Sequence, residues 1–374
     1  MNFEYEKLEN VCEILDSQRI PITEKDRKSG IYPYYGANGV QDYIDDFIFD
    51  DELVLLAEDG GNFGSKDKPI AYRVSGKCWV NNHAHVLKAK DIIDIDYLCY
   101  SLMFYNTSGL VNGATRQKLT QSAMRQMLIP LRKKDIQLKI VKKISLLFQL
   151  IEKRKQQLSK LDQLVKSKFI EMFGECKTNP KNWKLLNMED VAVVGSSKRV
   201  FVEELQEDGI PFYRGTEVGA LAEGKSIVPE LYIAENHYKE LVKATGIPQL
   251  GDLLMPSICP DGRIWVVNTE NPFYFKDGRV LWIHNIDTKF NSTFLLYTLK
   301  DRIMTDYLSI ASGTTFSELK IFTLKKCKIF SVPLPLQEQF AAFVEQVEKA
   351  KSSVKQSLEK LETLKKSLMQ EYFG

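Results

Sequence analysis

The sequence lacks the cysteine spacing of a disulfide framework or a zinc ribbon. It contains no CxxC pair, and its six cysteines are scattered: Cys12, Cys78, Cys99, Cys176, Cys259 and Cys327. Such usage is typical of a reducing compartment. There is also no uninterrupted apolar stretch of about 18 residues, which disfavours a membrane span. The opening MNFEYEKLEN has no basic segment followed by an apolar core. We therefore expect a cytoplasmic protein with no signal peptide and no membrane contact.

Intact catalytic motifs are lacking as well. NPFY (271–274) is similar to the Asn-Pro-Pro-Tyr loop of adenine methyltransferases, but the second proline is missing and no glycine-rich segment follows a strand to hold S-adenosylmethionine. DGGNFGSK (59–66) lacks the GxxxxGK[ST] spacing of a phosphate loop. PDGRIWVVNTEN (260–271) has no ExK that would complete a nuclease metal site. The sequence thus predicts no catalytic residue and a chain that is not an enzyme by itself.

The segment HAH (83–85) could place the imidazoles of His83 and His85 on one strand face, a spacing found in metal sites. No carboxylate or cysteine pattern accompanies them in the sequence, so we favour a structural or DNA-facing role and predict no metal ligand. The alternative, an enzyme that uses this pair, predicts stoichiometric metal in the purified protein.

What the sequence does contain is a long internal repeat. KSKFIEMFGE (166–175) matches KKSLMQEYFG (365–374), and GATRQKL (113–119) matches GTTFSEL (313–319). Further upstream, GIYPYYGANG (30–39) matches GIPFYRGTEVG (209–219) at a smaller shift, so the second copy carries about 20 inserted residues. The period is too long for a solenoid, and we infer a tandem duplication of one unit, a globular part followed by a helix.

Each copy ends in a heptad pattern. Positions 144, 151, 158, 165 and 172 are apolar, and so are positions 340, 347, 354, 361 and 368. We expect the second seam position to be supplied by Leu147, Leu161 and Phe169 in one helix and by Phe343, Ala350 and Leu364 in the other. A strict seven-residue period predicts a left-handed coiled coil. Gly174 suits a helix stop, and each helix should run for about 38 residues, or about 57 Å.

The globular parts carry mixed patterns. DFIFDDELVLLAE, AYRVSGKCWV and GRIWVVN predict strands, whereas YLCYSLMFYN and TFLLYTLKDRIMTDYL have helical spacing. Only about ten residues join the first helix to the second globular part, a span of at most about 35 Å. The second helix can therefore bury its seam only by running back along the first.

We predict an α+β fold with two globular α/β domains joined by two long antiparallel coiled-coil helices, a dumbbell with a pseudo-two-fold internal repeat. The expected boundaries are 1–131 for the first domain, 132–174 for the first helix, 175–334 for the second domain and 335–374 for the second helix. Between residues 132 and 170 there are twelve Lys or Arg and three acids. This basic run is either a solvated helix face or a surface that attracts a polyanion such as nucleic acid.

The repeat resembles the specificity subunits of type I restriction–modification systems. The resemblance covers essentially the whole chain and rests on YPYYGANG, VNNHAHVL, GATRQKLTQSAMRQMLIPL, KLDQLVKSKFIEMFGE and LPLQEQFAAFVEQVEKAKSSVKQSLEKLETLKKSLMQEYFG. It implies two target-recognition domains that each read half of an asymmetric, interrupted site in double-stranded DNA, with helices that set the unread spacer. It also implies two adenine methyltransferase subunits that use S-adenosylmethionine, and restriction subunits that use ATP and Mg in a full system. The chain itself would hold no cofactor.

Candidate DNA-binding residues lie in three places. YPYYGANG offers Tyr32, Tyr34, Tyr35 and Asn38 in an expected loop, where aromatic rings can pack on sugars and asparagine can pair with adenine; an ordinary aromatic-rich turn is the alternative. Arg214, at the matching place in copy two, is a candidate reader of guanine. Residues before the long helices are candidates for phosphate contacts, although capping also explains the threonines: Arg116, Lys118, Thr314 and Thr315. Lys66, Arg73 and Arg263 are expected secondary contacts.

Two further interpretations remain open at this point. One is a coiled-coil scaffold that binds only proteins, which predicts no DNA affinity even at low salt. The other lies within the family: an orphan or phase-variable specificity subunit of a methylation-only system.

Overall fold

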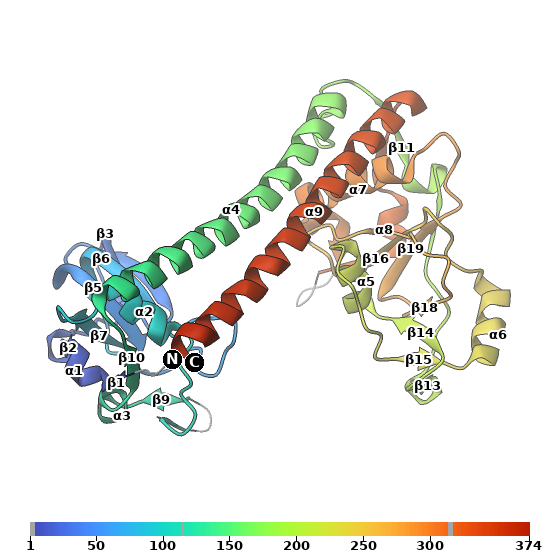
Figure 1. Cartoon of the computed structure of the whole chain (residues 1–374). Helices are drawn as coiled ribbons and strands as arrows, with labels where there is room; N and C mark the ends of the chain where they lie inside the picture. The colour runs from blue at the N-terminus through green and yellow to red at the C-terminus, as the bar shows by residue number, and fades with distance from the viewer. Residues whose placement is uncertain (1–3, 114–115, 313–316) are drawn as a thin grey trace. The chain divides into compact units, whose positions relative to one another are not determined.

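The computed structural model describes residues 4–113, 116–312 and 317–374. The chain forms two compact units (Figure 1). Unit 1 comprises Met1–Gln157 and Val354–Gly374, and unit 2 comprises Leu158–Ser353. Each unit therefore holds one globular part together with segments of both long helices. Within the described ranges, no helix combines the length and the apolar character that crossing a membrane would require.

Unit 1 is built on a six-stranded sheet in the order β2-β7-β5-β6-β3-β4. The strands are β2 (Cys12–Ile14), β3 (Ser29–Gly36), β4 (Gly39–Ile44), β5 (Phe49–Ala57), β6 (Ala71–Val80) and β7 (Ala84–Ala89). Two predicted strand segments thus form β5 and β6, because aromatic and β-branched side chains pack well on a pleated surface. Helix α2 (Ile95–Met103) packs Leu98 and Leu102 into the same core as Leu56 of the sheet.

Shorter elements complete unit 1. β1 (Glu4–Lys7) pairs with β10 (Leu128–Leu131), and β8 (Val111–Asn112) pairs with β9 (Lys118–Leu119). The remaining elements are the helices α1 (Leu8–Val11) and α3 (Gln121–Arg125) and the 3-10 turns η1 (Asp16–Gln18) and η2 (Glu24–Asp26). The predicted loop over YPYYGANG is wrong for most of its length, since residues 29–36 form β3 and only two residues turn the chain into β4.

Unit 2 contains two four-stranded sheets, in the orders β12-β19-β16-β17 and β13-β15-β14-β18. The strands of the first are β12 (Val193–Gly195), β16 (Leu253–Pro256), β17 (Trp265–Val266) and β19 (Val280–His284). Those of the second are β13 (Leu205–Gln206), β14 (Ile210–Tyr213), β15 (Tyr232–Ile233) and β18 (Tyr274–Phe275). Helices α5 (Gly215–Ala222), α6 (Glu235–Thr245), α7 (Ser292–Ile310) and α8 (Ile321–Lys325) and the turns η3 (Met188–Asp190) and η4 (Val202–Glu204) complete it.

The internal repeat is visible in matched backbone contacts. β11 (Lys184–Asn187) pairs with β22 (Lys328–Ser331) as β1 pairs with β10, and β20 (Ala311–Ser312) pairs with β21 (Glu318–Leu319) as β8 pairs with β9. The amide of Leu119 donates to the carbonyl of Glu58 at 2.7 Å, and that of Leu319 donates to the carbonyl of Ser257 at 2.7 Å. The second copy adds α5 and α6 where the first has β4 and its turns, which accounts for the inserted length.

The two long helices are α4 (Lys134–Phe173) and α9 (Leu334–Phe373), each of 40 residues. In unit 1, Lys143 Nζ donates to the Tyr372 hydroxyl at 2.9 Å and Lys155 lies 3.8 Å from Glu362, so the segments run antiparallel. In unit 2, Asp162 lies 2.8 Å from Lys351 and Phe169 packs on Phe340, which again gives antiparallel segments. Together with the two α/β parts, these segments confirm the predicted fold class.

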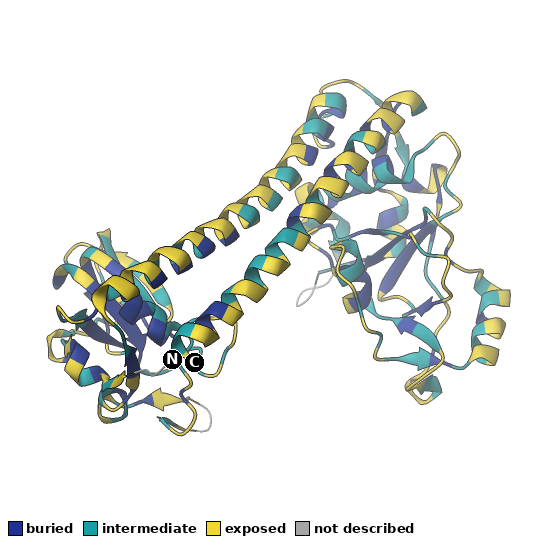
Figure 2. Cartoon of the chain, in the orientation of Figure 1, coloured by how far each residue is buried: buried dark blue, intermediate teal, exposed yellow. Residues whose placement is uncertain are grey.

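The heptad prediction needs one correction in α9. The second seam position does not fall on Ala350 and Leu364, which are exposed; the side chain of Leu364 is 46% exposed. Val344 and Leu358, four residues after the first seam positions, pack inward instead. This placement brings Lys351 and Lys365 into the seam, where their aliphatic stems are buried and their ammonium groups pair with acids. Figure 2 shows the resulting mixture of buried and exposed residues along both helices.

The end of α4 has a steric reason. Gly174 follows the last helical residue with a φ of +81°, a left-handed conformation that favours glycine, and a Cβ there would lie 2.6 Å from Pro180 Cγ. The predicted stop at Gly174 is therefore confirmed.

One buried glutamine anchors each long helix to its domain. Gln137 and Gln337 are both 0% exposed, and each accepts one main-chain hydrogen bond and donates two. The partners are Asp94 N, Ile92 O and Arg132 O for Gln137, and Asn291 N, Lys289 O and Val332 O for Gln337, at 2.7–3.0 Å. The same clamp thus fixes the start of each long helix to the loop that precedes α2 or α7.

Candidate nucleic-acid interface

Three segments that are distant in the sequence meet on the surface of unit 1. The side-chain amide of Asn38, in the β3–β4 turn, donates to the carbonyl of Gly60 at 3.0 Å. Asn62 donates to the side-chain oxygen of Asn38 at 3.1 Å. The amide of Gly60 donates to the carbonyl of Gln117, next to β9, at 3.2 Å. The predicted tyrosine-rich segment, the loop at 59–66 and the segment before α3 therefore form one surface.

Two predicted cations lie on this surface. Arg116 donates to Asp59 at 2.8 Å while 61% of its side chain stays exposed. Lys118 lies 3.0 Å from Glu58 with half of its side chain exposed. Each cation therefore has one carboxylate partner that orients it and enough exposure to meet a phosphate. Lys66, in the same loop as Asn62, is exposed.

The three tyrosines of β3 do not share one environment. Tyr34 is 1% exposed, its hydroxyl donates to the carbonyl of Ile22, and the guanidinium of Arg27 lies 4.2 Å from its ring centroid. This position in the core removes Tyr34 from the proposed DNA-facing set. Tyr32 and Tyr35 are half-buried and pack on Phe47 and Tyr72 respectively.

Arg73 also has a structural environment. Its Nε donates to Asp96 at 2.7 Å, its Nη1 donates to the carbonyl of Leu53 at 2.9 Å, and its Nη2 pairs with Glu52. The guanidinium ties β6 to β5 and to the first turn of α2. We therefore assign Arg73 to the domain framework and withdraw it as a DNA contact.

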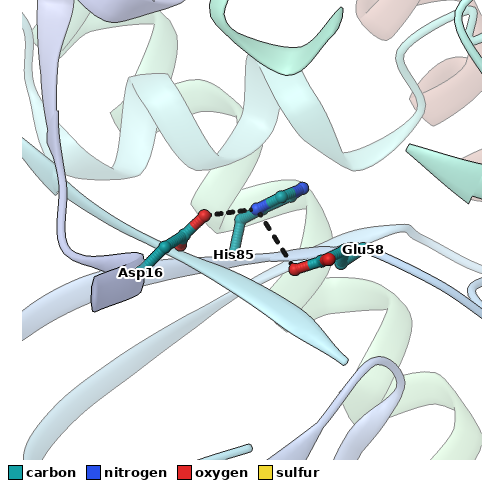
Figure 3. A group of neighbouring side chains, drawn as sticks. All are labelled: Asp16, Glu58 and His85. Carbon is teal, nitrogen blue, oxygen red and sulfur yellow. Dashed lines mark hydrogen bonds and ion pairs between the residues drawn. The ribbon is translucent and has the colours of Figure 1, made fainter. Parts of the chain in front are cut away.

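His85 lies in a buried polar cluster with Asp16 and Glu58 (Figure 3). Its Nδ1 is 2.6 Å from the carboxylate of Asp16, and its Nε2 is 2.9 Å from the carbonyl oxygen of Leu119. A carboxylate and a carbonyl oxygen are both hydrogen-bond acceptors, so each ring nitrogen of His85 faces an acceptor. The cluster ties η1, β7 and the residue after β5 to Leu119, the last residue of β9.

The ionic state of the two carboxylates fits this arrangement. Burial raises the pKa of Asp16, but hydrogen bonds from His85 and from the amide of Val86 outweigh it and hold that pKa below its ordinary value. Burial likewise raises the pKa of Glu58, but Arg19 and Lys118 outweigh it and lower that pKa.

We tested whether the same cluster could hold a metal ion, since its three ligand atoms lie within 4.8 Å of one another. Both ring nitrogens of His85 already lie within hydrogen-bond distance of oxygen atoms of Asp16 and Leu119, and Arg19 and Lys118 supply positive charge beside Glu58. The residues therefore do not fit a cation, and we assign them a structural role.

His83 precedes β7 and does not share a strand face with His85. Its Nδ1 is 2.6 Å from Asp59. Carboxylates do accompany both histidines, contrary to the sequence interpretation, because Asp16, Glu58 and Asp59 come from other elements. The pattern HAH therefore marks two separate hydrogen-bonded positions.

In unit 2, Arg214 begins α5 and is held by two carboxylates. Its Nη2 is 2.6 Å from Glu217 and 2.9 Å from Glu230, and its side chain is 40% exposed. Burial raises the pKa of Glu217, but hydrogen bonds from the Arg214 side chain and backbone outweigh it and lower that pKa to about 2. Reading of guanine by Arg214 would require at least one of these carboxylates to release it.

The remaining predicted residues of unit 2 are Arg263, Thr314 and Thr315. Arg263 pairs with Asp261 at 2.8 Å and lies 3.9 Å from Glu223. Thr314 and Thr315 lie outside the described residues. Lys320 and Arg279 both pair with Glu318 of β21, so unit 2 also presents cations next to this strand.

The structure thus contains an α/β part that is built twice, and in unit 1 polar and basic residues from three segments gather on its surface. The family model of the type I restriction modification DNA specificity domain matches residues 1–163 and 180–363, and the chain belongs to this family.

Individual relatives agree with this assignment. The chain is 30% identical over 360 residues to S.HindORF215P of Haemophilus influenzae, which is assigned as a type I restriction enzyme specificity subunit; the match covers 95% of this chain and 90% of the relative. It is 28% identical over 175 residues to the MjaIX specificity subunit of Methanocaldococcus jannaschii, which covers 44% of this chain and 37% of that one.

Two solved structures share the fold. One is the type I restriction–modification S subunit of M. genitalium, with a TM-score of 0.60 and 14% identity, covering 100% of this chain and 96% of that one. The other is a chain from a study of complex assembly and conformational transition in a type I system, with a TM-score of 0.54 and 16% identity, covering 99% and 97%.

Asn62, Asp59 and Arg19 belong to the surface or its support and were not predicted. Asn62 stands in DGGNFGSK, whose glycines permit a close approach of main chain and are the one local signal for this segment. No local signal could have found Arg19, because its partner Glu58 lies 39 residues away.

Proposed function

We propose that this specificity subunit binds double-stranded DNA through its two globular parts and reads a bipartite, asymmetric site. The observation that carries the proposal is a framework built twice under two different surfaces. The paired strands, the hairpins and the glutamine clamps match between the copies. The residues that face outward at matching positions do not.

The difference between the two surfaces supports an asymmetric site. Copy two has Glu318 at the position of Lys118. The carbonyls of Glu58 and Ser257 accept the matched hydrogen bonds, and the next residue is Asp59 in copy one and Ile258 in copy two. Unit 1 presents the Asn38–Asn62 amide pair with Arg116 and Lys118. Amides and guanidinium groups that read base edges discriminate between base pairs, so two surfaces of different chemistry favour two different half-sites.

We further propose that α4 and α9 set the unread spacer and dock partner subunits. The chain would bring to the DNA site two adenine methyltransferase subunits, which use S-adenosylmethionine. In a full system it would also bring restriction subunits, which use ATP and Mg. Exposed leucines on α4 support a docking role, since Leu146 is 57% exposed and Leu150 is 39% exposed one helical turn later. The basic residues Lys142 and Lys153 lie on the same face of the helix.

The proposal is tested by supplying the purified chain with its methyltransferase subunit and mapping methyl-adenine on a random-sequence duplex library. We expect methylation at one interrupted motif, with none when either protein is omitted. Robust methylation by this chain alone, or methylation at scattered adenines without a motif, would contradict the proposal. Addition of the restriction subunit with ATP and Mg distinguishes a full restriction system, which cuts unmethylated DNA, from a methylation-only system.

A further inference from the structure

Unit 2 contains a cavity of about 310 Å³ between the second half of α7 and α8. Its lining includes Arg302 and Asp306 of α7, Phe322 of α8, and Lys326 and Lys328 beyond α8. The volume is at the lower end of that found for small-molecule sites. Three cations face one acid, so the cavity is strongly basic.

Arg302 is the most informative residue of this lining. Its side chain is only 13% exposed, and its Nη1 lies 3.3 Å from the carboxylate of Asp306. Its Nε is buried and has no hydrogen-bond partner among the described residues. A buried charged donor without a partner is costly, and most such groups in folded proteins are satisfied by protein, water or a bound ligand.

The neighbouring groups favour an anion with an apolar or aromatic part. Lys177 also lies 3.9 Å from Asp306, so the single acid is shared by two cations. Lys328 donates to the side chain of Asn187 at 2.8 Å and is thereby held in place. Lys326 Nζ lies 4.0 Å from the ring centroid of Phe322, whose side chain is 63% exposed. An exposed ring beside clustered cations provides a stacking surface next to positive charge.

The first copy shows that the framework does not require these charges. At the positions of Lys326 and Lys328 it has Gln126 and Leu128. When α2 and α7 are matched at their N-caps, Asp94 and Asn291, the position of Arg302 is held by Tyr105. The Tyr105 hydroxyl accepts a hydrogen bond from the amide of Leu128 at 3.1 Å, so a neutral side chain serves in copy one.

We propose that this cavity binds a phosphate group of a nucleotide, with the guanidinium of Arg302 as the central donor and Lys326 and Lys328 as supporting cations. A phosphate group carries nearly two negative charges in a free monoester and one in the DNA backbone, and it offers several acceptor oxygens in either form, so three cations around one acid favour it. The cavity is larger than one phosphate, and the side chain of Phe322 provides a surface on which the base of the nucleotide can stack. The phosphate comes from a free nucleotide or from the DNA backbone; the second source rests on the function proposed above.

The test uses the full chain and two variants. Lys326→Gln with Lys328→Leu installs the residues of copy one, which the same framework already accepts, and Arg302→Gln removes the central donor. Lys289→Gln removes an exposed lysine of unit 2 that does not line the cavity, and it serves as the charge-matched control for Arg302→Gln. Binding of AMP and of inorganic phosphate is measured by calorimetry without DNA, and the salt dependence of duplex binding is measured with the methyltransferase subunit present.

We expect AMP and phosphate to bind the natural chain and the control, and to bind both cavity variants about tenfold more weakly or worse, since hydrogen bonds to charged groups are strong. An unchanged salt slope for DNA then identifies a free nucleotide as the source. The DNA backbone is identified as the source if the cavity variants lower the salt slope of duplex binding by about one phosphate contact and AMP competes with the duplex for the natural chain. The proposal is overturned if AMP and phosphate do not bind and the DNA slope is the same in all variants. If the natural complex does not bind DNA at all, the proposed function is contradicted. Binding of AMP to the natural chain would still support the phosphate site in that case.

Discussion

At the residue scale, the two buried glutamines carry the same structural task in the two copies. Gln137 and Gln337 each satisfy three main-chain groups in a place with no exposure. Methionine has a similar volume but offers no donor or strong acceptor. Gln137→Met therefore leaves three buried main-chain groups without partners, and we expect it to reduce the free energy of unfolding by roughly 3 kcal/mol.

Urea denaturation checks this prediction, and Gln337→Met should cost a similar amount because its hydrogen bonds are the same. Gln149→Ala, on an exposed face of α4, is the control and should change stability by less than about 0.5 kcal/mol. A loss at Gln137 no larger than that of the control would show that the clamp does not hold the helix.

The Glu217 carboxylate makes unit 2 sensitive to acid. Its pKa of about 2 in the folded protein lies below the ordinary value of about 4.3 for glutamate. A carboxyl with a lowered pKa contributes stability that is fully present above the ordinary pKa and is lost as the pH falls through the folded pKa. We expect the stability difference between the natural chain and Glu217→Gln to be constant above pH ~5 and to shrink between pH ~4.5 and ~2.

Urea midpoints measured from pH 7 downward test this expectation. Glu203→Gln, an exposed glutamate of the same unit, controls for the loss of one charge. A stability difference that stays constant down to the lowest pH at which the protein remains folded would show that the Arg214–Glu217 pair does not hold the carboxylate ionised.

At the scale of single elements, the stop of α4 depends on one glycine. Gly174→Ala places a Cβ at a φ of +81° and 2.6 Å from the ring of Pro180. We expect a loss of more than about 1 kcal/mol, because alanine is strained at positive φ and the ring must move as well. Gly278 has a φ of +63°, and a Cβ there would have no neighbour within 4 Å. Gly278→Ala therefore measures the cost of backbone strain alone. Equal losses in thermal unfolding for the two variants would exclude a contribution from Pro180.

The exposed leucines of α4 allow docking to be separated from folding. Leu146→Ser with Leu150→Ser changes side chains that are 57% and 39% exposed, so the chain should keep its thermal unfolding temperature. Binding of the methyltransferase subunit should weaken at least about tenfold, because each buried leucine contributes roughly 1.5–3 kcal/mol. Gln149→Ser with Gln156→Ser, also exposed on α4, is the control. Unchanged binding in an analytical pull-down titration would place the docking surface elsewhere.

Elements with a local signal were predictable from the sequence. The long helices follow from a seven-residue period, and the end of α4 follows from Gly174. Helices α4 and α9 differ from the expected 38 residues by only two. The seam of α9 was misplaced at Ala350 and Leu364 because apolar character alone was used, whereas the inward position is taken by Lys351 and Lys365 with buried stems. Side-chain type does not reveal which part of a long lysine is buried.

At the scale of the whole molecule, the candidate surface was predictable only in part. Asn38, Arg116 and Lys118 lie at the surface of unit 1, where turn and hairpin residues are usually found, but the sequence did not predict that they lie close together. Tyr34 was misjudged because a strand of period two turns alternate residues inward, and Arg73 because its partners Glu52 and Asp96 lie on other elements. Ion pairs between residues 20 or more positions apart depend on the order of strands in the sheet, which could not be predicted from the sequence.

The division of the chain into two differently surfaced copies predicts modular specificity. Replacing residues 1–131 by the corresponding domain of another specificity subunit should change only the half of the motif that unit 1 reads, because α4, α9 and unit 2 are retained. The replacement ends before Gln137, so the hydrogen-bonding side chain of the clamp is preserved.

The most direct test of this account is a methyl-adenine map of the genome of a host that expresses the methyltransferase subunit with either the natural chain or this exchanged chain. The account predicts one interrupted motif for each chain, with one half identical between them and the other half changed, and no motif in a host that lacks the chain. A change in both halves, or the same motif with either chain, would contradict the claim that each copy reads its own half-site.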